Sequence, residues 1–162
     1  MNDISALHEP ASKALSHVAV WLVLYLKGTG KITQVMLQSP LNASMLVSKA
    51  VGMCEVPGEG LAGFGEGPAY IAGHWVDERA FFPQIRDRTP CPATLDGQTF
   101  TGLPIPCTIE ISVPGDQPRT YKVEAESARI DFDHVGEYTA RITSAKHLPG
   151  EYTVKVEEKA NG

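Results

Sequence analysis

Alternation of apolar and polar residues runs through the second half of the chain and limits what it can fold into more than any other feature. A period of two places one face of a strand in a core and leaves the other face in solvent. Turn residues such as Pro, Gly and Asp separate the alternating runs. Five short strands at this spacing predict a small antiparallel β-sandwich over residues 94–157. The alternating runs are residues 107–113, 121–125, 130–132, 138–142 and 152–156.

The first half of the chain predicts a smaller β lobe, built on a hairpin, over residues 18–82. An apolar run at 18–26 is followed by a short loop with two glycines and then by a second run at 32–37. Glycine supplies the positive φ angles that a tight reversal needs, so the two runs predict paired strands. Residues 41–51 fit a helix or a strand, and both alternatives stay open. Together the two halves predict a mainly β protein with two lobes.

Segments rich in Gly and Pro predict what joins and surrounds the lobes. Residues 57–68 contain five glycines and predict a loop, which lacks the Gly-Lys-Ser/Thr ending of a phosphate-binding loop. Residues 70–76 predict two short extended pieces around a turn. Residues 83–93 contain three prolines and no periodicity, which predicts a linker. The polar ends, residues 1–17 and 158–162, predict an arm and a tail.

Charge and hydropathy argue against two classes of partner. The net charge is −5, and the 14 Lys and Arg residues are spread without a cluster, which disfavours binding to nucleic acid through its phosphates. The longest apolar run, residues 18–26, is nine residues long, whereas a helix needs about 20 residues to cross a bilayer. We therefore expect neither nucleic-acid binding nor a membrane span.

No motif predicts catalysis, a cofactor or a bound metal, so we expect a protein that is not an enzyme. The five histidines and three cysteines lack the spacing of zinc sites, and no Gly-x-Ser-x-Gly elbow is present. Asp131 and Asp133 share one face of a strand, which fits weak Ca²⁺ binding, but solvent-facing carboxylates beside a turn are the favoured interpretation. Cys91 and Cys107 can pair in an oxidising setting, and free thiols are the favoured alternative.

Four aromatic residues are candidates for contact with a partner. Trp75, Phe81 and Phe82 lie near turns and prolines, and Phe64 lies in the Gly-rich loop. Exposed aromatic side chains anchor protein partners or stack on sugar rings. Packing between the two halves of the chain is the alternative that competes with both of these roles.

The stretch Asp131-Phe132-Asp133-His134-Val135-Gly136-Glu137-Tyr138 resembles a strand pair of bacterial and phage immunoglobulin-like domains. The resemblance implies an Ig-like sandwich at the C-terminal end of the chain. It also implies that Tyr138 is a tyrosine-corner residue, whose hydroxyl bonds the backbone at the turn. Ala140 stands where the family has its core cysteine, so an antibody-type disulfide is not expected.

A wider pattern includes residues 24–32, 70–73, 90–97 and 103–107, followed by the Ig-like ending. This pattern is similar to small tail-associated proteins of tailed bacteriophages, encoded near the fibre, baseplate or tail-tip genes. The resemblance implies a virion structural protein without a cofactor, which contacts other tail proteins in homo- or hetero-oligomers. Two alternatives remain beside it: an accessory module that binds a host receptor or glycan at the cell surface, and an assembly chaperone for the tail fibre.

Overall fold

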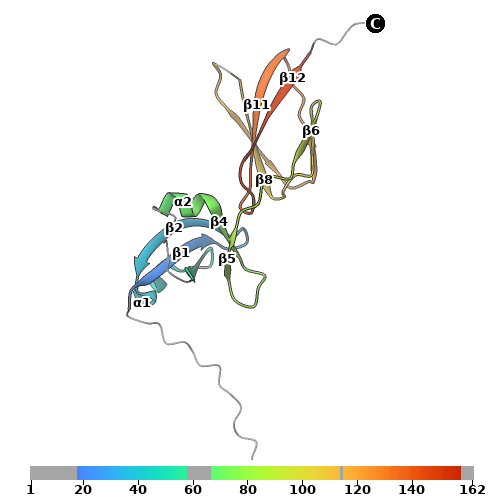
Figure 1. Ribbon diagram of the computed structural model, residues 1–162. Coiled ribbons are helices and arrows are strands. Elements are labelled where there is room, and N and C mark those ends of the chain that lie inside the picture. Colours follow the sequence, from blue (N-terminus) through green and yellow to red (C-terminus); the bar gives the residue numbers. More distant parts are fainter. Residues whose placement is uncertain (1–17, 58–66, 114, 158–162) are drawn as a thin grey trace, which may run out of the picture.

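The computed structural model describes residues 18–57, 67–113 and 115–157, which form two β lobes joined by a short connection (Figure 1). All strand pairs named in its sheets are antiparallel, and helices are few and short. The prediction of a mainly β protein is therefore confirmed. None of the helices in these residues is long and apolar enough to cross a membrane. The predicted arm (1–17), most of the Gly-rich loop and the tail (158–162) lie outside the described residues.

The first lobe consists of a three-stranded sheet of order β2-β1-β3, the hairpin β4-β5 and short helices. The predicted hairpin is present, with Val23 opposite Val35 in the register of β1 and β2. Strand β1 is buried along most of its length because helix α2 and β4 pack against the hairpin. The elements are β1 (Val20–Leu26), β2 (Lys31–Gln38), α1 (Pro40–Ala43), η1 (Ser44–Leu46), β3 (Val51–Glu55), α2 (Gly67–Gly73), β4 (His74–Asp77) and β5 (Gln84–Asp87).

The second lobe is a pair of sheets, of order β10-β7-β6 and β12-β11-β8-β9. Phe100 from the first sheet and Ile109 and Ile142 from the second are fully buried in one shared core, so the sheets face each other. Burial of each such side chain contributes about 1.5–3 kcal/mol. The strands are β6 (Thr94–Asp96), β7 (Thr99–Thr101), β8 (Cys107–Ser112), β9 (Arg119–Val123), β10 (Ser127–Arg129), β11 (Gly136–Thr143) and β12 (Gly150–Val156).

The connections of this sandwich can be compared with those of a constant-type immunoglobulin domain. There the first, second, fourth and fifth strands share a sheet. Here the fourth strand, β9, pairs with the third, β8, and leaves a three-stranded sheet opposite. The hydroxyl of Tyr138 donates a hydrogen bond to the backbone oxygen of His134, at 2.9 Å, which is a bond of the kind that the resemblance implies for this tyrosine.

Four local predictions differ from the structure. Residues 70–73 belong to helix α2, where Tyr70 is buried and stacks on His74. The predicted linker 83–93 contains strand β5, which is held by backbone pairing with β4 and has too many exposed residues to show alternation. Strands β6 and β7 were not predicted, because each has only three residues. The predicted strand 130–132 lies after β10, which ends at Arg129.

The second lobe should lose stability in alkali because of Tyr152. Its hydroxyl donates to the backbone oxygen of Ala93 at 2.8 Å, and burial together with the Cys91 thiol raises the pKa of Tyr152 to about 12. An unfolded tyrosine has a pKa of about 10, so the folded state binds this proton more tightly and stability falls as the pH rises from about 10 to about 12. Tyr152→Phe should flatten part of this fall in urea midpoints followed by far-UV circular dichroism. Equal slopes in both proteins would contradict the assignment.

Candidate functional site

Phe81 and Phe82 lie in the loop between β4 and β5 and are largely exposed to solvent. Their exposed fractions are 94% and 69%. The two rings contact each other edge to face, with centroids 4.8 Å apart. Hydration of two adjacent aromatic rings is unfavourable in free energy, which makes the pair a candidate for burial against a partner. We call this pair the aromatic tip.

The base of the loop is fixed although its tip is exposed. The backbone N–H of Arg79 donates to the Asp77 carboxylate at 3.1 Å. On the other side, the thiol of Cys54 donates to the backbone oxygen of Pro83 at 3.3 Å. Burial raises the pKa of the Cys54 thiol, which keeps it a donor at neutral pH. The aromatic tip is therefore presented from an anchored base, which lowers the entropy lost on binding.

The other two aromatic candidates do not join the aromatic tip. Trp75 lies on β4 and is half buried, with the ammonium group of Lys146 5.2 Å from its ring centroid. Because Lys146 belongs to the second lobe, Trp75 packs between the two halves of the chain. This packing is the alternative to partner contact that the sequence left open. Phe64 lies outside the described residues.

A second exposed apolar surface was missed by the sequence prediction. It lies on helix α1 and the turn after it, where Met45 is 87% exposed and Leu46 51%. Ser39 caps the helix by accepting from the backbone N–H of Asn42, and Pro40 occupies the first turn. This Ser-Pro pair is a helix start signal that could have resolved the ambiguity of residues 41–51. The exposed apolar residues of this surface are Leu41, Met45, Leu46 and Val47.

The two lobes are tied together along the connection after β5. Thr89 accepts from the backbone N–H of Leu148 at 2.8 Å and donates its own N–H to Lys146. Its hydroxyl also bonds Nδ1 of His147 at 2.9 Å. These bonds hold the connection against the loop between β11 and β12. A cleft of about 660 Å³ lies between the two lobes.

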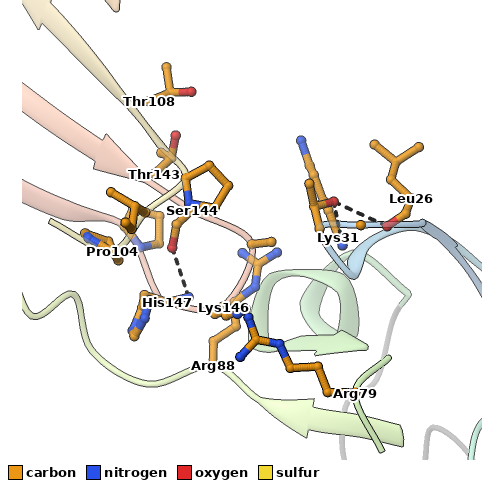
Figure 2. A pocket seen from close by; sticks show the side chains of 16 residues that line it. Leu26, Lys31, Arg79, Arg88, Pro104, Thr108, Thr143, Ser144, Lys146 and His147 are labelled. Atoms are coloured by element: carbon orange, nitrogen blue, oxygen red, sulfur yellow. Dashed lines mark hydrogen bonds between the residues drawn. The ribbon is translucent and has the colours of Figure 1, made fainter. Parts of the chain in front are cut away.

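The interlobe cleft carries basic side chains from both lobes (Figure 2). Arg88 is the most enclosed of them: its Nε donates to the backbone oxygen of His74 at 3.2 Å, and burial lowers the pKa of its guanidinium. Apolar side chains such as Leu26 and Ile105 form part of the wall. The cations that line the cleft are Lys31, Arg79, Arg88 and Lys146.

His74 is a buried polar residue beside the cleft, and its role is structural. Its Nδ1 lies 2.9 Å from the backbone oxygen of Tyr70, and its Nε2 lies 3.1 Å from the carboxylate of Asp87. These contacts, with the stacked Tyr70 ring, join α2 to β5.

Metal chemistry finds no support in the parts of the chain that the structure describes. There, no three His, Cys, Asp or Glu residues are grouped to hold an ion. Cys54, Cys91 and Cys107 are free thiols. Comparison with protein-family models, curated proteins and solved structures finds no match. Two features of the described residues are suited to contact with another molecule: the exposed aromatic tip and the interlobe cleft.

Proposed function

We propose that the protein is a structural or adaptor subunit of a bacteriophage tail that acts through protein–protein contacts. The phage context rests on the sequence resemblance described above. The observation that carries the contact role is the 94% exposure of Phe81 on a loop with a fixed base. Burial of Phe81 and Phe82 by a partner removes apolar surface from water, which contributes favourable free energy to binding.

The outer strands of the sheets, as the described residues define them, offer a second mode of contact to the same kind of partner. Strands β2 and β3 are the outer strands of their sheet, as are β12 and β9 in the second lobe. An outer strand carries backbone donors and acceptors that another chain can complete by strand addition. A tail subunit with such edges binds its neighbours through backbone hydrogen bonds, with the aromatic tip adding apolar burial.

The host-glycan alternative receives less support than the virion role. Stacking on a sugar ring needs an open aromatic face, and Trp75 is half buried beneath Lys146. The most exposed rings belong to Phe81 and Phe82, at 94% and 69%, and these lack the polar group that Trp and Tyr use at glycan sites; Tyr121 is less exposed, at 43%. The proposal therefore retains protein partners for the aromatic tip.

The double variant Phe81→Ser/Phe82→Ser should lose its place in the particle. Loss of a central aromatic contact costs about 2 kcal/mol or more, so we expect incorporation into purified particles to fall by about tenfold or more, measured by quantitative mass spectrometry. The variant should keep its urea midpoint, because substitution of exposed residues changes stability by about 0.5 kcal/mol or less.

Val135→Ser is the matched control, since Val135 is also apolar and exposed, at 61%, but belongs to the second lobe. Its incorporation should equal that of the wild type. Absence of the wild-type protein from finished particles would reject the structural role and favour the assembly chaperone. Normal incorporation of the double variant would remove the aromatic tip as the contact.

A further inference from the structure

Within residues 18–57, 67–113 and 115–157, no ion pair neutralises the cations of the interlobe cleft. The ion pairs of the described residues join other side chains, and none of them includes Lys31, Arg79, Arg88 or Lys146. The chain as a whole is acidic, with a net charge of −5, yet among the residues that the structure describes no Asp or Glu lines this cleft. Four positive charges without an ion-pair partner among the described residues, gathered in one concave surface of an acidic protein, create a local field that attracts anions.

Two carboxylates next to the cleft accept hydrogen bonds from backbone N–H groups. Glu78 accepts the backbone N–H of Gly28 at 2.6 Å, and Asp77 accepts that of Arg79. Neither of these acidic residues lines the cleft. The four cations of the cleft still outnumber these two carboxylates, so the local charge stays positive. The cleft volume of about 660 Å³ lies in the usual range of ligand sites.

We propose that the interlobe cleft binds an acidic polypeptide segment of a partner protein, with its carboxylates on Lys31, Arg79, Arg88 and Lys146. The charges come from separate elements of both lobes: Lys31 from the start of β2, Arg79 and Arg88 from either side of β5, and Lys146 from the loop after β11. Charges distributed in this way match carboxylates that are spaced along an extended chain.

The chemistry of the cleft favours carboxylates over a phosphate group. Phosphate sites in proteins use converging backbone N–H groups, at helix N-termini or in nests. Here the N–H of Gly28 is donated to Glu78, that of Lys31 to the Thr29 hydroxyl, and that of His147 to Ser144. The side chains of Leu26 and Ile105, exposed by 39% and 41%, add apolar surface that an acidic peptide with apolar residues can cover.

The test uses the purified full chain and a fluorescein-labelled hexaglutamate peptide, followed by fluorescence anisotropy. We expect saturable binding that weakens with added salt, and no binding of the matching hexaglutamine peptide. Lys31→Gln/Arg79→Gln should weaken hexaglutamate binding by about tenfold. Both side chains are exposed, so the fold is preserved. The inference goes beyond the proposed virion role. Its test uses only the purified protein and a peptide, so its outcome does not depend on that role.

The matched control is Arg119→Gln/Lys155→Gln, which removes the same charge from exposed residues that do not line the cleft. Its affinity should remain within about twofold of the wild type. Equal weakening in both double variants would show attraction to the whole surface and overturn the proposal, as would no binding of hexaglutamate. Tighter binding of inorganic phosphate or ATP, measured by displacement of the peptide, would reject a polypeptide ligand.

Discussion

Gly30→Ala is expected to lower the free energy of unfolding of the first lobe by about 2–6 kcal/mol, as the sum of backbone strain and overpacking. Gly30 has a φ of +71°, a conformation that alanine adopts only at a cost. An added Cβ would also overlap the backbone oxygen of Val76 and lie 3.0 Å from the Trp75 ring. Because the N–H of Val76 donates to the oxygen of Gly30 at 2.8 Å, the backbones of the hairpin and β4 cannot separate without breaking that bond.

Tryptophan fluorescence isolates this effect, since both tryptophans of the chain, Trp21 and Trp75, lie in the first lobe. The urea midpoint followed by fluorescence should fall by about 1 M or more. Gly28→Ala is the matched control: Gly28 also has a positive φ, +83°, but nothing lies within 4 Å of its added Cβ. Gly28→Ala should lower the free energy of unfolding only through backbone strain, by about 1–3 kcal/mol. Equal losses in the two variants would contradict the contact with Val76.

Phe100→Ala is expected to cost the second lobe about 3–5 kcal/mol, through lost burial and the cavity that remains. The Phe100 side chain is fully buried between the two sheets and meets Tyr152 edge to face, with ring centroids 5.6 Å apart. Strand β7 is only three residues long, so few other contacts compensate for the loss of this ring.

The same pair of probes locates the damage from Phe100→Ala. Far-UV circular dichroism reports both lobes, so its transition should gain an early phase, whereas the fluorescence transition should move much less. Val135→Ala serves as the control, because Val135 is 61% exposed and its loss should change stability by about 0.5 kcal/mol or less. A fluorescence midpoint that falls as far as the dichroism midpoint would contradict separate cores for the two lobes.

The residues of the aromatic tip could be named from the sequence, but their exposure could not. Phe81 and Phe82 stand next to a proline, and the sequence alone allows them to pack between the lobes or to face solvent. Exposure follows from the pairing of β4 with β5, which places the residues between them at the end of a hairpin. Trp75, only six positions earlier, lies on β4 and becomes half buried beside Lys146.

The interlobe cleft could not be predicted, because its charges are scattered along the chain. Lys31 and Lys146 are more than a hundred positions apart, and the basic residues show no cluster in the sequence. Hydrogen bonds of Thr89 with His147 and Leu148 hold together the two lobes to which Lys31 and Lys146 belong. Such a contact depends on backbone geometry in three dimensions and leaves no periodic signal.

The sequence by itself determined the strands with a period of two and the hairpin of the first lobe. Those patterns are local: alternate burial along β8 or β11, and glycines with positive φ between β1 and β2, follow from neighbouring residues. Only the tertiary structure decided the pairing of β5, the strands β6 and β7, and the cleft between the lobes. These features are stabilised by hydrogen bonds and contacts between distant segments, whose energy does not depend on local periodicity.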